Sequence, residues 1–286
     1  MTTSEPQAAQ QAQASPPVEV RRHRLSTRIW HWVNALTLFV MLMSGLMIFN
    51  AHPRLYWGHY GANSDPAWLE IGADAEGGFL KLGERRIGTT GLIGRWTDGT
   101  GQVQNRAFPG WATIPSAYDL AGARRWHLAF AWLLGIGLLL FLIRAFWNRH
   151  AQRDLTPGLG ELKPKHLWQE VKDHARLRFP TGEAALRYNT LQKLSYFTVI
   201  FIFLPLIILS GLGMSPAIDA AWPWIVDLFG GRQSARSVHF IIAFSLLAFV
   251  LVHLVMVVLA GPVNEVRSMI TGRYRVPQPR VKEDAA

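Results

Sequence analysis

Four long apolar segments of this chain contain no Asp, Glu, Lys or Arg, and they constrain its fold more than any other feature. They run approximately over residues 30–49, 126–143, 194–214 and 238–260. A helix needs about 20 mostly apolar residues to cross the hydrocarbon core of a membrane. The second segment is short, but the long side chain of Arg144 can extend from its end to the interface. We therefore predict an all-α integral membrane protein, a four-transmembrane-helix bundle.

The composition supports a membrane protein and excludes several kinds of redox centre. Half of the 286 residues (50%) are hydrophobic, and 12 are Trp. Because there is no Cys, the chain lacks disulfides, iron–sulfur clusters, thiolate-ligated haem and covalent C-x-x-C-H haem attachment. The net charge is +10, but the basic residues cluster beside the apolar segments and no nucleic-acid-binding motif is present. Membrane lipid, and no nucleic acid, is the expected environment.

The distribution of Lys and Arg predicts the orientation. Basic residues precede the first segment, crowd the connection between the second and third, and follow the fourth. By the positive-inside rule both termini are expected to be cytoplasmic. The expected parts are a disordered cytoplasmic tail (1–20), a transmembrane domain (21–265) and a cytoplasmic tail (266–286). Within the domain we expect a long extracytoplasmic loop (50–125) and a cytoplasmic loop (148–190).

Four histidines lie in or at the ends of the apolar segments. His239 and His253 are 14 residues apart on the fourth segment, which places them within about 40° on one helix face and roughly 21 Å apart along the axis. Ionisable side chains are costly in a bilayer and usually have a partner or a functional role there. With the predicted orientation, His31 matches His253 in depth near the cytoplasmic side, and His127 matches His239 near the outer side.

The two matched pairs predict two bis-histidine haem sites. The pair His31 and His253 is called the inner pair below, and His127 and His239 the outer pair. Two imidazoles complete the six-coordination of haem iron, whereas zinc usually takes three or four protein ligands. We therefore expect two noncovalent b-type haems enclosed by the bundle. Gly45 leaves room for a macrocycle at outer-haem depth, or permits close helix packing; the same two interpretations apply to Gly135 and Gly137.

Other residues near the segment ends were considered as additional contacts of haem. His52 and His59 follow the first segment, and either is a possible substitute ligand or a neighbour of a haem propionate. Basic residues near the segment ends are expected neighbours of the propionates: Arg28, Arg124, Arg125 and Arg236.

These residues resemble a known family. The stretch Arg24-Leu25-Ser26-Thr27-Arg28-Ile29-Trp30-His31-Trp32-Val33-Asn34-Ala35, the pair Trp126-His127 and the spacing His239-x13-His253 are similar to the bacterial cytochrome b-561 and nickel-hydrogenase b-type cytochromes. That family includes the membrane cytochrome subunits of formate dehydrogenases, hydrogenases and thiosulfate reductases. The resemblance covers about half of the chain, and it implies the same histidine pairing as the depth argument.

The resemblance also implies a quinone site. Formate dehydrogenase cytochromes carry an Asn-x-x-Gln-Lys stretch where quinone binds, and here it corresponds to Asn189, Gln192 and Lys193 at the cytoplasmic start of the third segment. Their amide and ammonium groups would donate hydrogen bonds to a quinone carbonyl. In the alternative interpretation, Asn189 caps a helix and Lys193 extends to the interface without a ligand.

The long outer loop departs from the family pattern. Its four Trp residues favour a folded cap over the outer haem, which we interpret as a docking platform for an extracytoplasmic redox subunit, such as a molybdopterin oxidoreductase. Its Gly-rich pieces lack the strand-to-helix context of a nucleotide site.

The predicted function is transmembrane electron transfer between the quinone pool and this partner in a respiratory chain. The chain would be an electron-transfer subunit rather than an enzyme with substrate chemistry of its own. Two alternatives keep the histidines: a transporter or proton relay, and a stand-alone quinol oxidase of a small acceptor. Pro205 would break a transporter helix, but the segments contain no acidic residue, and the only internal repeat is a Ser-Gly-Leu shared at Ser44 and Ser210. A passive membrane anchor would need no matched histidines.

Overall fold

Four long helices dominate the computed structural model, which describes residues 19–149, 156–158, 160–176 and 189–276. They are α1 (Leu25–Phe49), α2 (Leu120–Trp147), a composite helix over Thr190–Gly213, and α8 (Arg232–Ala260). All four are long and apolar enough to cross a membrane. The prediction of four membrane-spanning helices is confirmed.

Three of these helices begin well before the apolar segments that predicted them. In α2, the carboxylate of Asp119 caps the helix and accepts a hydrogen bond from the backbone N–H of Gly122 at 2.8 Å, so the helix starts at Leu120 rather than Trp126. Helix α8 likewise starts at Arg232 rather than Val238. The charged first turns were missed because hydropathy detects only the hydrocarbon-spanning part. His127 and His239 therefore lie after about two helical turns, not at the helix starts.

The third membrane-spanning helix changes its winding along its length. It consists of α4 (Thr190–Phe197), a π-helical stretch η4 (Thr198–Phe203) and α5 (Leu204–Gly213). Pro205 has no backbone N–H and its ring crowds the preceding turn, which a locally wider π-helix relieves. The helix therefore continues through Pro205, and the break considered for a transporter does not occur.

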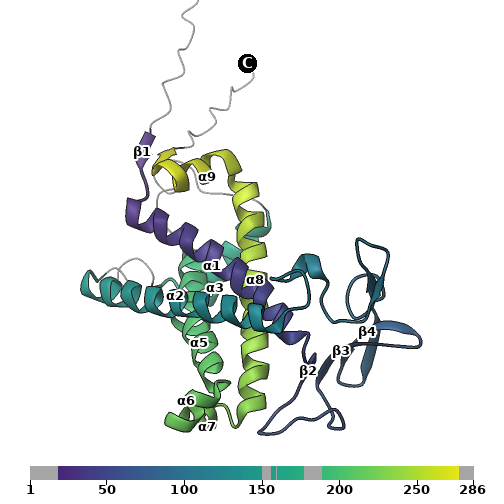
Figure 1. Cartoon of the computed structure of the whole chain (residues 1–286). Helices are drawn as coiled ribbons and strands as arrows, with labels where there is room; N and C mark the ends of the chain where they lie inside the picture. Colours follow the sequence, from purple (N-terminus) through teal and green to yellow (C-terminus); the bar gives the residue numbers. More distant parts are fainter. Residues whose placement is uncertain (1–18, 150–155, 159, 177–188, 277–286) are drawn as a thin grey trace, which may run out of the picture.

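The long helices form two hairpins. Helix α1 packs against α2, and α5 packs against α8 with Ile207, Ile242 and Leu246 buried between them. In Figure 1, α1 and α2 run across the upright pair of α5 and α8. Close backbone packing is extensive within each hairpin and sparse between α8 and either α1 or α2. The hairpins are therefore separate packing units joined mainly through side chains.

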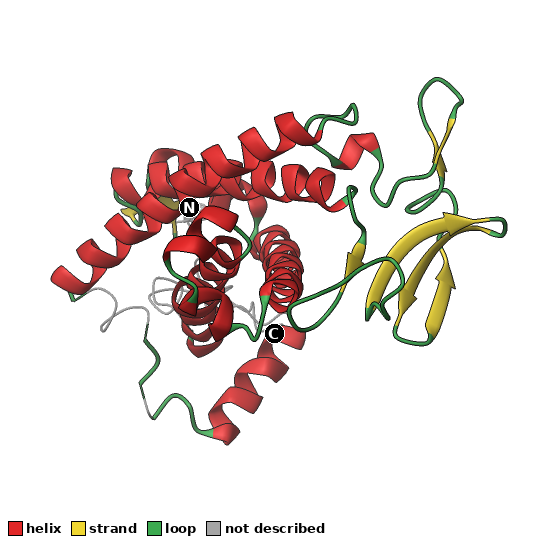
Figure 2. Cartoon of the chain, turned by 60° about the horizontal axis from the view of Figure 1, so that its bottom comes forward, coloured by secondary structure: helices red, strands yellow, loops and turns green. Residues whose placement is uncertain are grey.

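The connection between α1 and α2 contains β-strands, which the sequence pattern did not reveal. An antiparallel sheet has the order β2 (Arg54–Leu55), β3 (Leu69–Asp74), β4 (Gly77–Leu82) and β5 (Arg85–Gly88). A small hairpin of β6 (Trp96–Thr97) and β7 (Val103–Gln104) and a 3₁₀ turn, η1 (Gly110–Ala112), follow. Figure 2 shows the strands to one side of the helices. The chain is thus mostly helical rather than purely α-helical.

The start of α8 holds this connection in place. The indole N–H of Trp68 donates to Ser237 Oγ at 2.9 Å, and Ser237 Oγ donates to the backbone oxygen of Tyr56 at 2.5 Å. The N–H of Gly58 donates to Ser234 Oγ at 2.7 Å. Gly231, which has φ +125°, lies so close to Gly58 that any Cβ would lie 2.5 Å from its backbone. Folding of the connection is therefore coupled to the first turn of α8. Helices α6 (Pro216–Ala221) and α7 (Trp224–Leu228) link α5 to α8.

Ordered elements also occur where tails or an irregular loop were expected. Strand β1 (Glu19–Arg21) pairs with β8 (Arg273–Arg275), and the amphipathic α9 (Pro262–Thr271) precedes β8. Trp32 donates to the carbonyl of Met269 at 3.3 Å, which ties α1 to α9. Residues 19–20 of the tail expected to be disordered belong to β1, and the expected cytoplasmic tail 266–286 includes the end of α9 and β8. The pairing of two segments so distant in the sequence leaves no local signal. Residues 1–18 and 277–286 lie outside the described residues. In the loop 148–190, α3 (Pro164–Ala175) is helical; residues 150–155, 159 and 177–188 are not described.

Gly137 tests the packing of α1 on α2. A Cβ there would lie 2.0 Å from Cη2 of Trp30, whereas a Cβ at Gly135 would have no neighbour within 4 Å. We expect Gly137→Ala to lower the stability by about 1–3 kcal/mol because the ring must move, and Gly135→Ala to be neutral or stabilising. Unfolding of the purified protein in detergent measures both. Equal stability of the two variants would contradict the Trp30 packing.

Candidate functional site

The structure brings the four intramembrane histidines together in two pairs. The ring centres of His31 (α1) and His253 (α8) are 6.4 Å apart, with the ring planes at 56°. Those of His127 (α2) and His239 (α8) are 6.2 Å apart, with the planes at 59°. Each pair joins α8 to a different helix of the other hairpin. The pairing predicted from depth is the pairing found in space.

Hydrogen bonds fix the protonation of the outer pair. His127 Nδ1 lies 3.1 Å from the backbone oxygen of Met41, and His239 Nδ1 lies 3.0 Å from that of Ile207. A carbonyl oxygen can only accept, so each Nδ1 carries the hydrogen in the neutral ring. The lone pair is then on Nε2 in both rings. This arrangement is typical of metal-binding histidines, which donate their other ring N–H to an oxygen.

The inner pair lies among aromatic side chains. His31 makes an edge contact with Trp32, and the ring of Phe249 stacks on His253 with the ring centres 6.1 Å apart. Within the described part of the chain, His31 Nδ1 is buried and has no hydrogen-bond partner. The two pairs therefore share a ring separation but differ in their hydrogen bonding.

The glycines have different neighbours from those expected. A Cβ at Gly45 would lie 3.3 Å from Cε1 of His127, so the absent side chain makes room for the histidine ring. Gly137 likewise accommodates Trp30, whereas Gly135 faces open space. Gly211, which the sequence did not single out, lies against His239 as Gly45 lies against His127, with the same 3.3 Å to Cε1.

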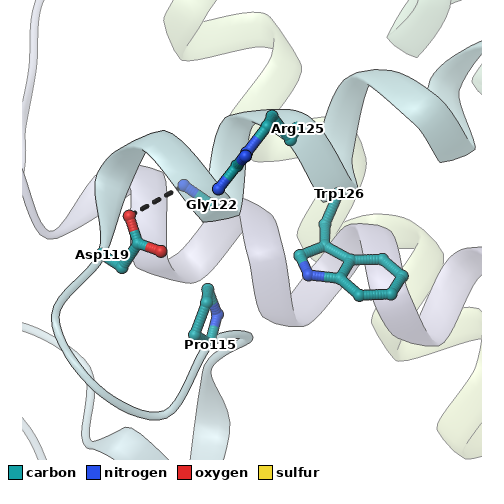
Figure 3. Close-up of a pocket in the computed structure, with 5 residues that line it drawn as sticks. All are labelled: Pro115, Asp119, Gly122, Arg125 and Trp126. Carbon is teal, nitrogen blue, oxygen red and sulfur yellow. Dashed lines mark hydrogen bonds between the residues drawn. The ribbon is translucent and has the colours of Figure 1, made fainter.

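The four arginines considered as propionate neighbours have varied surroundings. Arg28 donates to the backbone oxygen of Ile270, and Arg236 donates to the backbone oxygens of His52 and Arg54. Arg124 and Arg125 are exposed near the start of α2. Figure 3 shows Arg125 beside Trp126, at a surface depression of about 380 Å³ near the Asp119 cap.

The remaining predicted histidines have partners in the connection between α1 and α2, called the outer connection after its expected side. His52 Nε2 lies 3.2 Å from the hydroxyl of Tyr56, and the two rings stack. Burial, with the nearby Arg236 and Arg54, lowers the pKa of His52. His59 makes a ring contact with Tyr60. Neither is paired with another histidine in the described structure.

The three residues predicted to contact quinone form the start of α4. Asn189 Oδ1 accepts from the backbone N–H of Gln192 at 2.8 Å, and Gln192 Oε1 accepts from the N–H of Asn189 at 3.3 Å, a capping box. Lys193 Nζ pairs with Glu161 at 2.8 Å, and this contact lowers the pKa of the Glu161 carboxyl. The structure thus contains the cap that was the alternative interpretation for Asn189. Quinone contact stays a prediction.

Acidic and imidazole groups of α3 surround this helix start. Glu170 accepts from the backbone N–H groups of Thr190 and Leu191, at 3.2 and 3.0 Å. His166 Nε2 lies 3.1 Å from both Thr190 Oγ1 and Glu170 Oε1. The start of the third membrane-spanning helix therefore lies beside a cluster of ionisable side chains.

Comparison with known sequences identifies the family. Residues 22–272 match the profile of the prokaryotic cytochrome b561 family, which is most of the chain. The chain belongs to this family. It is therefore a multi-pass membrane b-type cytochrome with a role in electron transport, as the sequence resemblance predicted.

Similar curated proteins are redox-complex subunits. One is a putative protein-methionine-sulfoxide reductase subunit, YedZ1, of Azospira oryzae, 34% identical over 49% of this chain and 67% of the relative. Two others are probable Ni/Fe-hydrogenase B-type cytochrome subunits. That of Azotobacter vinelandii is 29% identical over 46% of this chain and 58% of the relative. That of Azotobacter chroococcum is 27% identical over 44% of this chain and 56% of the relative. The chain thus spans little more than half the length of the two hydrogenase subunits.

The histidine pairs fit the haem that a prokaryotic cytochrome b561 implies. Imidazole nitrogens bind transition metals at about 2.0 Å and lie about 1.1 Å from their own ring centre, so two rings on opposite sides of one iron have centres roughly 6 Å apart. The measured 6.4 and 6.2 Å agree with this separation. Among the described residues, no group of three or more His, Cys, Asp or Glu is arranged to hold a metal ion. The donor set therefore suits axial ligation of haem better than a zinc site.

Proposed function

We propose that this cytochrome binds two b-type haems and carries electrons across the bacterial inner membrane, between the quinone pool and a redox subunit on the extracytoplasmic side. The observation that supports this proposal best is the arrangement of two histidine pairs along α8. Each pair has the ring separation expected for two axial ligands of one iron. His31 with His253, and His127 with His239, would hold the two haems.

The protein residues would do four things at these sites. Bound haem supplies one-electron chemistry between ferric and ferrous iron. The two histidines of each pair would complete the coordination of one iron, which would disfavour the binding of oxygen or peroxide. The apolar helices exclude water around the sites. The Nδ1–H bonds of His127 and His239 would leave Nε2 as the nitrogen that binds the metal, and α8 would set the spacing between the sites at roughly 21 Å along its axis.

The proposed orientation places both chain ends in the cytoplasm. The basic residues follow this arrangement, and β1, α9 and β8 lie together at one end of the helices (Figure 1). The inner pair is toward this end, because His253 is close to the end of α8 that leads into α9. The strands of the outer connection are then extracytoplasmic.

Quinone would bind near the start of α4, on the same side as the inner pair. An ammonium group has three donors, so Lys193 can keep its contact with Glu161 and still donate to a quinone carbonyl. His166, Glu161 and Glu170 would exchange the protons that accompany quinone chemistry. Asn189 and Gln192 would shape the site by capping the helix rather than by direct donation.

A redox subunit would dock on the extracytoplasmic face. The curated relatives are named as subunits of a reductase and of hydrogenases, which supports a partner enzyme for this chain. The folded connection between α1 and α2 offers exposed aromatic side chains, including Trp57, Tyr60 and Trp111. A molybdopterin oxidoreductase is one class of redox enzyme that could serve as this partner. A proton relay is less well supported, since both outer imidazoles already donate Nδ1–H to helix carbonyls.

The central test is the haem content of the purified protein. We expect a b-type absorption spectrum and, by pyridine haemochrome assay, about two haems per chain, with both reduced by a quinol. One haem per chain would exclude the two-site arrangement, and an absence of b-type haem would overturn the proposal.

Separate substitution of the two α8 histidines tests the pairing. His239→Ala is expected to remove the outer haem and keep the inner one, and His253→Ala to do the reverse, because each variant loses one axial ligand of one site. His59→Ala, outside both pairs, is the control and should keep both haems. Redox titration of the visible spectrum identifies which haem remains. Loss of both haems from a folded His239→Ala protein would show that the pairing is wrong.

Lys193 tests the quinone site. We expect Lys193→Ala to slow haem reduction by a quinol analogue at least several-fold, with the haem content and the chemical reduction by dithionite unchanged. Lys163→Ala removes an exposed lysine two positions from Glu161, the partner of Lys193, and serves as the charge control. If stopped-flow traces of the two variants coincide, Lys193 does not contact quinone.

A further inference from the structure

Two helices of different hairpins present the same Ser-Gly pair to a histidine. Ser44 and Gly45 of α1 lie against His127 of α2, with Ser44 Oγ 3.1 Å from His127 Nδ1. Ser210 and Gly211 lie against His239 of α8, again with 3.1 Å between Oγ and Nδ1. These are the two positions of the repeated Ser-Gly-Leu. The repeat is therefore a repeated contact with a histidine.

The hydroxyl groups are arranged as acceptors for the imidazoles. Ser44 Oγ donates its hydrogen to the backbone oxygen of Val40 at 2.6 Å, and Ser210 Oγ donates to that of Ile207 at 3.1 Å. Because each hydroxyl already donates its hydrogen to a backbone carbonyl, it can only accept a hydrogen bond from Nδ1–H. Each Nδ1–H is then shared between a hydroxyl and a helix carbonyl. Both serines are fully buried (0% exposed), so water does not compete for these bonds.

The glycines allow the rings to approach the helix backbone. A Cβ at either Gly45 or Gly211 would lie 3.3 Å from the Cε1 atom of the neighbouring ring, closer than ordinary van der Waals contact. An alanine would push the ring away from the carbonyl and hydroxyl that receive its Nδ1–H. The serine and the glycine of each pair thus act on the same ring: the serine accepts its hydrogen bond, and the glycine leaves room for the ring beside the helix.

The inner pair has no such arrangement in the described structure. His31 Nδ1 is buried without a partner, and the ring contact found for His253 besides His31 is its stacking on Phe249. A ring N–H that donates to an oxygen makes the opposite nitrogen a stronger ligand. A stronger ligand stabilises ferric over ferrous iron and lowers the reduction potential.

We propose that Ser44-Gly45 and Ser210-Gly211 are positioning residues that orient His127 and His239 as haem ligands and lower the reduction potential of the outer haem. This inference rests on the proposed function, since it concerns the same outer site. It adds that the two hairpins contribute equivalent supports, one for each axial ligand.

The experiment compares Ser44→Ala, Ser210→Ala and the double variant, each purified with its haem. The control is Ser245→Ala, whose hydroxyl donates to the carbonyl of Ile241 in α8 without contacting a histidine. Potentiometric titration of the visible spectrum should show one of two haem components shifted to higher potential in each single variant, and further in the double variant. The second component and the Ser245→Ala protein should match the parent. The low-spin ferric electron paramagnetic resonance signal of the shifted haem should change as well.

Two further variants separate positioning from general packing. Ser210→Thr keeps a hydroxyl and should return the potential toward the parent value. Gly211→Ala should alter the same haem signal while Gly135→Ala leaves it unchanged. Selective loss of the outer haem in a serine variant supports the inference as well, because the inner haem reports that the protein is folded.

The outcomes that oppose the inference are distinct from those that oppose the proposed function. A double variant with two haems at parental potentials overturns the role of the serines. Shifts of both haems together, or of the inner haem alone, assign the serines a purely structural role and also overturn it. If the parent protein contains no haem, the proposed function itself fails before any variant is compared.

Discussion

Helix α8 carries one histidine of each pair, and the rest of the arrangement depends on this rigid element. Its hydrogen bonds are satisfied internally, as a bilayer requires, so 14 residues fix the axial distance between His239 and His253. The other hairpin supplies one partner from each of its helices. Neither α1 nor α2 packs closely on α8 through its backbone. The histidine rings extend across the space between these helices, and the ring centres of each pair are 6.2–6.4 Å apart. The proposed haem-binding geometry therefore arises between two hairpins that pack as separate units.

Much of this arrangement was predictable because it follows local rules. Membrane-spanning helices are detected by length and apolarity, and loop charge gives an expected side for each histidine, which fixes their relative depths. Two positions 14 residues apart share a helix face whatever the rest of the fold does. The positions of His31 and His127 then left one consistent pairing by depth. The helix starts were placed several residues late, because Asp119 and the charged first turns of α2 and α8 lie outside the apolar windows.

The features that were not predicted depend on contacts between distant residues. Strands β1 and β8 are formed by opposite ends of the described chain, and neither segment alternates clearly enough to predict a strand. The sheet of β2 to β5 buries Leu55, Leu69 and Ile71 against the end of α1, and short strands rich in Gly and charge give a weak periodic signal. Ser44 and Ser210 were visible as a repeat, but the repeat could not reveal that each faces a histidine on another helix. The interpretation of Asn189 was open for a similar reason, since cap and ligand use the same side-chain atoms.

The connection between α1 and α2 contacts α8 within the helical turn that precedes His239. Trp68 donates a hydrogen bond to Ser237, and Arg236 donates to two backbone carbonyls of the connection. Ser237 and Arg236 are both within three positions of His239 on α8. Ala235, four positions before His239, is fully buried (0% exposed), so this whole turn is held on several sides. Two independent restraints thus act on the same imidazole: the connection fixes its backbone, and Ser210 with the Ile207 carbonyl fixes its ring. A ring held both at its backbone and at its Nδ1 has little freedom left at Nε2, and this restraint would preorganise that nitrogen for the proposed haem iron.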